Sequence, residues 1–288
     1  MRIDRLSILG VGLLGGSIGL AARSSIKPSK IIGYGHRNST LDHAVKVGAI
    51  DEGTTDLAAA VRQAGLIILC TPVGLFESIL QQIGPLLMDG AVVTDVGSTK
   101  RSVVDQAERL LPAKVKFVAS HPIAGSEKRG VEFARADLFQ GALCITTPTA
   151  KTDQKALADV EGFWQALGMR THRLSPEDHD RLLSDVSHLP HALAAALIAM
   201  QSDDALDLSG KGFLDATRIA GGDGGLWRDI FLDNRDNLRS GIERLQKELA
   251  NLTSMLDSRE ADALKKWLDS AAARRDELAQ KKLRESAE

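Results

Sequence analysis

The sequence contains little cysteine, carries almost no net charge and lacks a long uninterrupted apolar run. Its 288 residues include two cysteines, Cys70 and Cys144, and 36 Lys and Arg against 38 Asp and Glu. Two cysteines in apolar runs exclude a disulfide scaffold and a cysteine-based zinc site. A net charge of −2 argues against a nucleic-acid groove or a polybasic membrane patch. We therefore expect a cytoplasmic protein with no nucleic-acid or membrane partner.

The N-terminus needs separate attention, because Arg2 and Arg5 precede an apolar stretch as in a secretory signal peptide. The glycines within this stretch instead have the spacing of a phosphate-binding turn, which favours the cytoplasmic interpretation. Apolar runs elsewhere are short. The run Ala192–Met200 is well below the roughly 20 residues that cross a bilayer.

Short β-rich runs alternate with helix-like stretches over the first 174 residues. The runs LIILC (66–70) and AVVTDV (91–96) are apolar without alternation, as expected for strands buried on both faces. The pattern predicts an α/β fold with a doubly wound parallel sheet and helices on both faces. The expected strands are Leu6–Leu9, Ile31–Tyr34, Leu66–Cys70, Val92–Val96, Phe117–Ala119, Leu143–Thr146 and Arg170–Leu174.

The pattern becomes almost entirely helical after Leu174. Ser175 and Pro176 form a helix start, with Ser at the N-cap and Pro at N1. The run His191–Met200 is apolar all round, which predicts a helix buried on every side. Leucine and isoleucine side chains between Leu238 and Leu256 follow a heptad spacing that requires a partner helix, in the same chain or in a second subunit. We expect a nucleotide-binding domain over 1–174 and an all-α dimerisation domain over 175–288.

The motif Gly10-Val11-Gly12-Leu13-Leu14-Gly15 follows the first strand and opens the first helix. Its glycines permit a tight turn, a close approach of backbone to pyrophosphate, and close packing of helix on strand. In this context the motif favours a Rossmann-type dinucleotide site that includes Gly10, Gly12, Leu13, Leu14 and Gly15. The alternative is a glycine-rich turn without a ligand.

The end of the second strand distinguishes NAD from NADP, because an acid there binds the ribose 2′-hydroxyl of NAD. Tyr34-Gly35-His36-Arg37-Asn38-Ser39 contains no acid. Arg37 can pair with a 2′-phosphate and His36 can donate a hydrogen bond, so NADP is favoured and NAD is the alternative. Thr71 and Pro72 follow a strand at the carboxyl edge of the sheet, where they are expected to line the cofactor.

Ser98 and His121 also follow strands at the carboxyl edge. Ser98 either binds nicotinamide or substrate, or caps the helix 100–111. Pro122 restricts His121 to an extended conformation, which we interpret as a histidine fixed in a rigid loop facing the crevice. An imidazole there can accept the proton that alcohol oxidation releases.

The second half offers further polar candidates. His188 and His191 are three residues apart and can share a helix face; His191 is the candidate substrate contact, although simple packing of both is an alternative. Arg218 lies among apolar neighbours and needs an anion, either a bound carboxylate or a buried acid. Trp227 opens the next helix and is placed to cover the site. No metal site is expected, because the histidine pair lacks further ligands nearby.

Together these segments resemble the prephenate/arogenate (cyclohexadienyl) dehydrogenase family of tyrosine biosynthesis. The resemblance extends over nearly the whole chain, through GVGLLGGS, the TP turn, DVGS, SHPIAGSEKRG, SHLPH, FLDATRIAGG and WRDIFLDN. It implies oxidative decarboxylation of prephenate or arogenate, with hydride transfer to NAD(P), by a homodimer.

The resemblance also implies a role for each matching residue. His121 would be the base that takes the proton of the ring hydroxyl, and Ser98 would help to bind that hydroxyl. Arg218 would bind a substrate carboxylate. The remaining expected substrate contacts are His191, Ser126, Glu127 and Trp227.

Two other functions stay open at this point. One is another NADP-dependent dehydrogenase with a helical C-terminal domain, such as a β-hydroxyacid dehydrogenase or a pyrroline-carboxylate reductase. The other is a non-catalytic nucleotide-binding dimer. The choice between prephenate and arogenate is also open.

Overall fold

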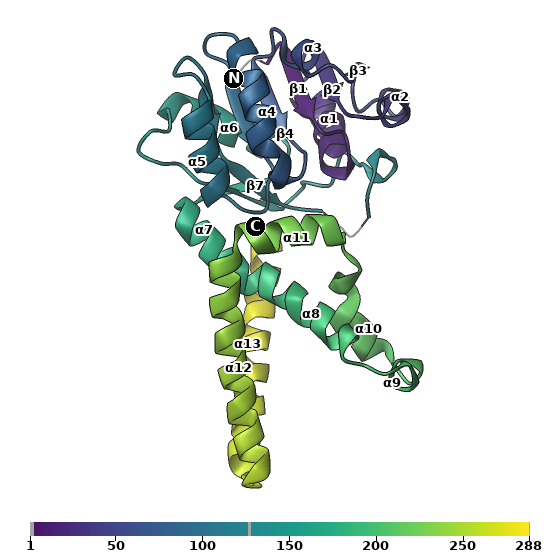
Figure 1. Cartoon of the computed structure of the whole chain (residues 1–288), viewed down its shortest axis with the longest axis vertical. Coiled ribbons are helices and arrows are strands. Elements are labelled where there is room, and N and C mark those ends of the chain that lie inside the picture. The colour runs from purple at the N-terminus through teal and green to yellow at the C-terminus, as the bar shows by residue number, and fades with distance from the viewer. Residues whose placement is uncertain (1–2, 126–127, 288) are drawn as a thin grey trace. The chain divides into compact units, whose positions relative to one another are not determined.

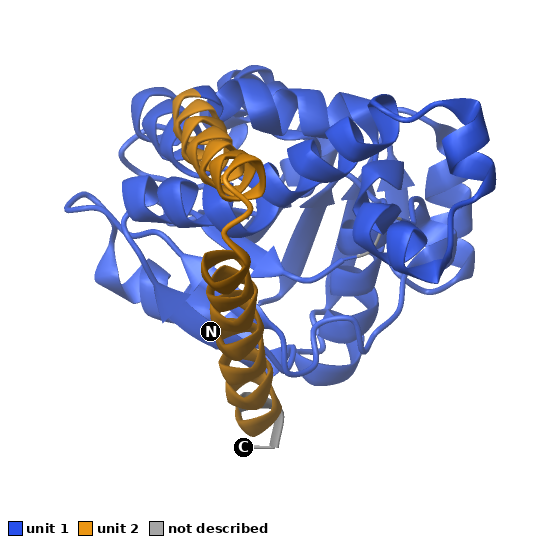
Figure 2. Cartoon of the chain, turned by 90° about the horizontal axis from the view of Figure 1, so that it is seen from below, with its two compact units in different colours: residues 1–235 blue, residues 236–288 orange. Residues whose placement is uncertain are grey.

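The computed structural model describes residues 3–125 and 128–287, and the chain divides into two compact units, residues 1–235 and 236–288 (Figures 1 and 2). The first unit contains a parallel sheet of strands β1 (Arg5–Leu9), β2 (Lys30–Tyr34), β3 (Glu52–Thr54), β4 (Leu66–Leu69), β5 (Val92–Asp95) and β6 (Lys116–Val118). The strand order is β3-β2-β1-β4-β5-β6. The strand order therefore reverses between β1 and β4, the place where sheets of this type bind ligands at their carboxyl edge.

Helices cover both faces of this sheet (Figure 1). They are α1 (Leu13–Ser25), α2 (Asn38–Lys46), α3 (Leu57–Val61), α4 (Phe76–Ile83), α5 (Arg101–Leu110) and α6 (Gln154–Ala166), with short 3₁₀ turns η1 (Val73–Leu75), η2 (Gly84–Leu86) and η3 (Val131–Phe133). The predicted doubly wound α/β fold is therefore confirmed.

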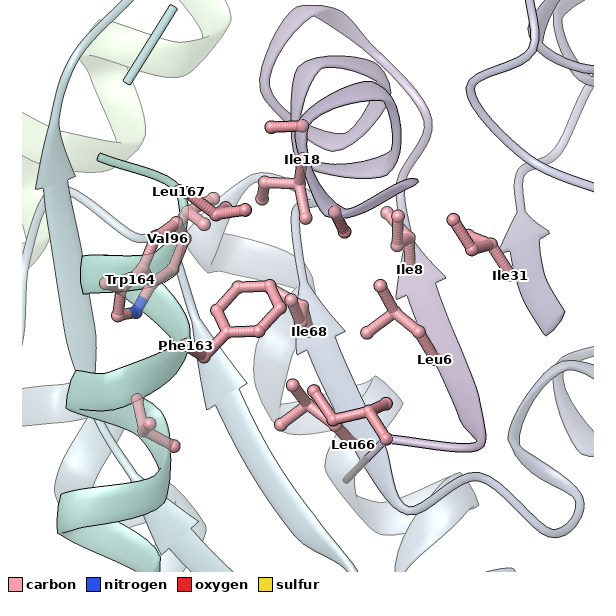
Figure 3. Packing of buried hydrophobic residues seen from close by; sticks show 14 of the residues in the cluster. Leu6, Ile8, Ile18, Ile31, Leu66, Ile68, Val96, Phe163, Trp164 and Leu167 are labelled. Atoms are coloured by element: carbon pink, nitrogen blue, oxygen red, sulfur yellow. The ribbon is translucent and has the colours of Figure 1, made fainter. Parts of the chain in front are cut away.

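Strand β4 shows why the fold follows from the sequence. Leu66 and Ile68 pack in one core with α1 and α6, and Figure 3 shows them near Phe163. Ile67 and Leu69 pack in a second core with α3, α4 and α5. Successive side chains point to opposite faces of a strand, so a strand between two layers of helices must be apolar at every position.

The candidate base lies in a second sheet that was not expected. Strands β7 (Ser120–Ile123), β8 (Leu143–Thr146) and β9 (Arg170–Arg173) form this sheet in the order β7-β8-β9, with β7 antiparallel to β8. The predictions that His121 lies in a loop and that 143–146 and 170–174 extend the parallel sheet are therefore wrong. Pro122 fits β7 because an edge strand tolerates a residue without an N–H.

The rest of the first unit is helical, as predicted. It contains α7 (Pro176–Leu183), the π-helical turn η4 (Ser184–His188), α8 (Leu189–Ala199), α9 (Asp203–Asp207), α10 (Lys211–Thr217), the 3₁₀ turn η5 (Arg218–Gly221) and α11 (Gly224–Asp233). The Ser175 side chain caps α7 by accepting the N–H of Asp178 at 3.0 Å. The π turn comes just before Pro190, which has no N–H to continue the α-helical ladder.

Helix α8 differs from its prediction. Of its residues only His191 and Ala194 are buried, whereas Leu193 and Ile198 are each 39% exposed and the following Met200 is 73% exposed. An apolar helix with one exposed face is typical of a surface that another protein covers. The prediction of burial on every side is wrong for the single chain.

The run 176–199 is long and apolar enough, by length and composition alone, to cross a membrane. It also carries His179, Asp180 and His188, which are buried and hydrogen-bonded to other parts of the first unit. Such polar contacts are typical of a helix in a folded domain.

The second unit consists of most of α12 (Arg235–Asp257) and of α13 (Ala261–Ala287) (Figure 2). The predicted long helix through the leucine heptads is confirmed. Along that seam Leu238 is buried, whereas Leu249 is 50% and Leu256 is 56% exposed.

Candidate active site

The glycine turn has the geometry that its motif predicts. Gly10 has φ +108°, and a Cβ there would lie 2.7 Å from the backbone of Cys70 and 2.9 Å from the nitrogen of Thr71. A Cβ on Gly15 would lie 2.1 Å from the carbonyl oxygen of Gly10. Only glycine fits these positions. The turns after β1 and β4 are therefore in contact, beside the switch point of the sheet.

The N-terminus of α1 has the properties of an anion site. Its N-cap is Gly12, which has no capping side chain, and the first turn contains no acid. A Cβ on Gly12 would meet nothing within 4 Å, so this backbone is open to a ligand. Nearby, the buried hydroxyl of Thr71 has no hydrogen-bond partner among the described residues. Free N–H groups at a helix start, together with an unpaired hydroxyl, fit a dinucleotide pyrophosphate.

The region after β2 is basic and open. His36 and Arg37 are exposed, and Arg37 is the N-cap residue of α2. No carboxylate occurs between Tyr34 and Ser39. This end of the site therefore presents a guanidinium where NAD-binding proteins of this fold place an acid.

One buried carboxylate connects the turn after β5 with β7. Asp95 accepts the backbone N–H of Gly97 at 2.8 Å and that of Ser120 at 3.0 Å. It also forms an ion pair with Nζ of Lys100, and both side chains are fully buried. Gly97 and Ser120 each directly precede a predicted catalytic residue. Asp95 therefore fixes those two residues relative to each other.

The Ser120 side chain anchors the start of β7. Its hydroxyl donates to the carbonyl oxygen of Asp95 at 2.6 Å, accepts from Nε1 of Trp164 at 3.0 Å, and lies 2.8 Å from Oγ1 of Thr94. All of these groups are buried. The strand that carries His121 is thus attached to β5 and to α6 by buried hydrogen bonds.

A chain of hydrogen bonds leads from His121 to the start of α5. Nδ1 of His121 lies 2.9 Å from Nε2 of His179, and Nδ1 of His179 lies 2.8 Å from Oδ1 of Asp180. The Asp180 carboxylate also accepts the backbone N–H of Lys100 at 2.7 Å and of Arg101 at 3.0 Å. Helix α7 therefore supports the candidate base His121 through the side chains of His179 and Asp180.

The same contacts settle one of the two interpretations of Ser98. The N-cap residue of α5 is Lys100, whose own side chain makes no capping bond, and the free N–H groups of the helix start are bound by Asp180. The interpretation of Ser98 as the helix cap is therefore wrong. Its half-buried position on the turn after β5 is compatible with the other interpretation, a contact to ligand.

The electrostatic surroundings keep the candidate base neutral. Burial lowers the pKa of His121 well below its ordinary value of 6.5, and repulsion from the protonated form of His179, from Lys100 and from the protonated form of His188 acts in the same direction. Burial also lowers the pKa of His179, although Asp180 opposes this shift. His121 is therefore an unprotonated imidazole at neutral pH, as a proton acceptor must be.

His188 and His191 share one helix face, as their spacing predicted. The ring of Trp227 stacks on His191 with centroids 3.6 Å apart and lies 6.3 Å from His188. Asn234 lies 3.1 Å from Nδ1 of His188 and donates to the carbonyl oxygen of Asp180 at 2.7 Å. Nε2 of His188 and Nδ1 of His191 are buried without a hydrogen-bond partner in the described part of the chain. This aromatic group therefore offers polar atoms to a ligand.

The candidate substrate contacts that remain are Arg218, Ser126 and Glu127. Arg218 is exposed at the start of η5, which packs against α8. Asp215, one turn earlier, forms an ion pair with Lys211. Ser126 and Glu127 lie outside the described residues.

Comparison with known proteins identifies the family. The family model described as "Prephenate dehydrogenase, nucleotide-binding domain" matches residues 18–173, and the model "Prephenate dehydrogenase, dimerization domain" matches residues 175–270. The chain belongs to the prephenate dehydrogenase family. It is a dehydrogenase, which excludes the pyrroline-carboxylate reductase type and the non-catalytic dimer.

Individual relatives support the same family assignment. The prephenate dehydrogenase of Bacillus subtilis is 34% identical, with 96% of this chain and 76% of the relative covered. The cyclohexadienyl dehydrogenase of Zymomonas mobilis is 33% identical, with 90% of each covered. The crystal structure of the Aquifex aeolicus prephenate dehydrogenase, in complex with hydroxyphenyl propionate and NAD+, superposes with a TM-score of 0.91 at 37% identity, covering 96% of this chain and 99% of that one.

Several residues of this dehydrogenase were missed in the sequence. Asp95, Lys100, His179, Asp180 and Asn234 are buried polar residues that connect the predicted site residues. The adjacent pair His179 and Asp180 on α7 lies between other charged residues, Asp178 and Arg181, and has no local signature. Their partners lie 58 and 80 residues away, and no local pattern shows such distances.

The buried histidines predict a loss of stability in mild acid. Burial lowers the pKa of His121, His179, His188 and His191, and that of His188 reaches about 4. Between pH 6.5 and the folded pKa values, the unfolded chain binds more protons than the folded chain. The free energy of unfolding therefore falls as the pH falls, by up to about 1.4 kcal/mol per pH unit for each histidine.

Urea unfolding at pH 7.5, 6.5, 5.5 and 5.0 measures this effect. We expect the midpoint to decrease steadily below pH 6.5. The variant His188→Gln is expected to reduce the slope of the unfolding free energy against pH. The reduction should correspond to about one bound proton, or about 1.4 kcal/mol per pH unit. An unfolding free energy that stays constant or increases from pH 7.5 to 5.0 would show that these imidazoles are not held neutral.

Proposed function

We propose that this enzyme oxidises prephenate and releases its ring carboxylate as CO₂, forming 4-hydroxyphenylpyruvate, with NADP as the favoured acceptor. The observation that carries this proposal is the placement of His121. A neutral imidazole lies on β7, fixed through Asp95 to the turn that carries Ser98. This is the arrangement that removal of a hydroxyl proton beside a nicotinamide requires.

The chain's own residues perform three tasks in this reaction. The α1 N-terminus with Gly12, and the turn at Thr71 and Pro72, bind the dinucleotide. His121 takes the proton of the ring hydroxyl, and Ser98 binds that hydroxyl. When bound, the nicotinamide accepts the hydride from C4 of the ring. Loss of CO₂ then makes the ring aromatic, which is strongly downhill and needs no further catalytic group.

The helical residues of the first unit are assigned to the substrate. Arg218 pairs with a substrate carboxylate, because a carboxylate matches the two-pronged guanidinium. The unpaired ring nitrogens of His188 and His191, beside Trp227, support a polar substrate in this region. Ser126 and Glu127 are proposed to lie near the substrate side chain.

Initial rates with prephenate or arogenate, each with NAD or NADP, test the proposed reaction. We expect prephenate with NADP to give the highest kcat/KM. Replacing Arg37 with alanine is expected to raise the KM for NADP at least about 10-fold and to leave the KM for NAD within about twofold, because a charge-assisted phosphate contact contributes about 1.5–3 kcal/mol. Absence of turnover with both substrates would overturn the proposed reaction; an equal effect of the variant on both cofactors would overturn the NADP assignment.

The variant Arg218→Ala is expected to raise the KM for prephenate about 10- to 100-fold with a smaller change in kcat, because it removes binding of a carboxylate. Steady-state rates over a range of prephenate concentrations measure this split. Arg62→Ala is the matched control, because Arg62 is exposed just before β4, at the opposite edge of the sheet. An unchanged KM in Arg218→Ala would make the arginine structural only.

We further propose that the domains extend over residues 1–174 and 175–288 and that the enzyme is a cytoplasmic homodimer formed through the helical domain. The two family models meet near residue 174, and the second describes a dimerisation domain. The exposed apolar face of α8 and the half-exposed leucines of α12 are surfaces that a second copy would cover.

A further inference from the structure

The side chains of Asp180, His179 and His121 form a hydrogen-bond chain, in which the charge of Asp180 assigns the donors and acceptors. The chain begins at Asp180, which is 4% exposed. Burial acts to raise the pKa of Asp180, but the hydrogen bonds from His179 and from the backbone N–H groups of Arg101 and Lys100 outweigh it and keep that pKa below its ordinary value. Asp180 is therefore an ionised carboxylate, which can only accept hydrogen bonds.

The ionised carboxylate determines the positions of the protons on both imidazoles. Because Asp180 only accepts, the proton of neutral His179 lies on Nδ1, and its Nε2 carries a lone pair. Nδ1 of His121 faces this lone pair at 2.9 Å, so Nδ1 of His121 carries a proton and donates. The remaining ring nitrogen of His121, Nε2, then has a lone pair and no proton.

We infer that His179 and Asp180 are positioning residues that hold His121 in the Nδ1–H tautomer, with Nε2 presented as the proton acceptor of the reaction. This inference rests on the proposed role of His121 as the base. The O–H bond of the substrate breaks, its proton bonds to Nε2, and the Nδ1–H bond to His179 is kept. The opposite tautomer would present an N–H to the hydroxyl and could not accept its proton.

Two titratable groups that act on the pKa of His121, Lys100 and His188, have other partners, although Nε2 of His188 has none among the described residues. The Lys100 ammonium is paired with Asp95. His188 has its Nδ1 beside the Asn234 amide, which also donates to the carbonyl oxygen of Asp180. The Asn234 amide thus attaches the end of α11 to Asp180, the first residue of the hydrogen-bond chain.

Two substitutions of His179 separate the positioning role from simple packing. Glutamine keeps an acceptor near the position of Nε2 but is not basic, whereas leucine keeps the bulk and removes the acceptor. We expect kcat of His179→Gln to stay within about fivefold of wild type, and kcat of His179→Leu to fall at least about 50-fold, with the KM for prephenate changed less than about threefold in both. His172→Gln, an exposed histidine on β9, is the matched control.

Asp180 also caps α5, so its variants need a coupling test. Asp180→Ala alone is expected to lower kcat about as much as His179→Leu. In the double variant a further loss of less than about threefold is expected, because both residues act through the same tautomer. Additive losses would overturn the inference, and so would a kcat of His179→Leu within threefold of His172→Gln. Thermal denaturation of each variant identifies losses that come from unfolding.

A direct reading of the tautomer does not depend on turnover. NMR of the full-length protein labelled with ¹⁵N-histidine is expected to show the His121 proton on Nδ1 in wild type and in His179→Gln. In His179→Leu we expect a part or all of it on Nε2. A wild-type proton on Nε2 would overturn the inference even if the enzyme turns over prephenate. Conversely, a proton on Nδ1 in an enzyme inactive on both substrates would overturn the proposed reaction and leave the hydrogen-bond chain intact.

Discussion

Replacement of His121 by asparagine is expected to lower kcat for prephenate at least about 100-fold, the lower end of what a positioned general base contributes. Asparagine has a similar size and polar character, but its amide cannot take a proton at neutral pH. The proposed dinucleotide site lies elsewhere, at the α1 N-terminus and the turn after β4. The dissociation constant for the cofactor should therefore change less than about threefold, and the loss should appear in kcat.

Steady-state kinetics and cofactor titration by fluorescence measure the two effects separately. His172→Asn is the control for a histidine substitution in the same small sheet, since His172 is exposed on β9. Turnover of His121→Asn within about threefold of the control would mean that another group takes the proton. A large loss of cofactor affinity would instead indicate that His121 shapes the nucleotide site.

Removal of the Asp95 carboxylate is expected to destabilise the enzyme by about 3–5 kcal/mol, because it leaves the Lys100 charge buried without a partner. Asp95→Ala also leaves the N–H groups of Gly97 and Ser120 without their acceptor. A loss of this size is a large part of the roughly 5–15 kcal/mol that stabilises a typical domain. Urea unfolding, followed by circular dichroism, measures it.

Two matched variants test whether this loss of stability comes from an unpaired buried charge. Asp89→Ala removes a carboxylate that is also ion-paired, with Lys114, but is 85% exposed, and its cost should be below about 1 kcal/mol. The double variant Asp95→Leu with Lys100→Met should be more stable than Asp95→Ala, because no buried charge is left unpaired. Equal stability losses for Asp95→Ala and Asp89→Ala would contradict the buried-pair explanation.

The α/β part of the fold was predictable because its information is local. The central strands of the parallel sheet contain apolar runs, and the helices between strands have apolar faces of their own. β3 (Glu52–Thr54) and β7 were missed, because three or four residues with mixed polarity, one of them Pro122, carry no periodic signal. The small mixed sheet around His121 depends on antiparallel pairing with residues 143–146, a contact between segments about 20 residues apart.

The helical region shows a different limit. Helix α8 is apolar, as its sequence predicts, but the single chain leaves Leu193, Ile198 and Met200 at least partly exposed. Composition shows that a surface avoids water and does not show whether the same chain or a second copy covers it. For that reason burial within one chain was predicted where a subunit surface is the better explanation.

The parts of the site that have a local sequence motif were predictable from the sequence. The parts that depend on contacts between side chains were less predictable. The glycine turn, His121 and the pair His188 and His191 all have local signatures. The supporting carboxylates Asp95 and Asp180 have none, because each acts across a tertiary contact. Glycines show where a ligand can approach, whereas the groups that determine the protonation of a base become visible only in the folded molecule.

The most direct test is a crystal structure of the enzyme with oxidised cofactor and 4-hydroxyphenylpyruvate, in which the distance from Nε2 of His121 to the ring oxygen is measured. A separation of about 2.6–3.2 Å, with Ser98 on the same oxygen, is expected for a base that has just taken this proton. A ring oxygen bound by other groups, with Nε2 of His121 more than about 5 Å away or turned from it, would contradict the assigned chemistry.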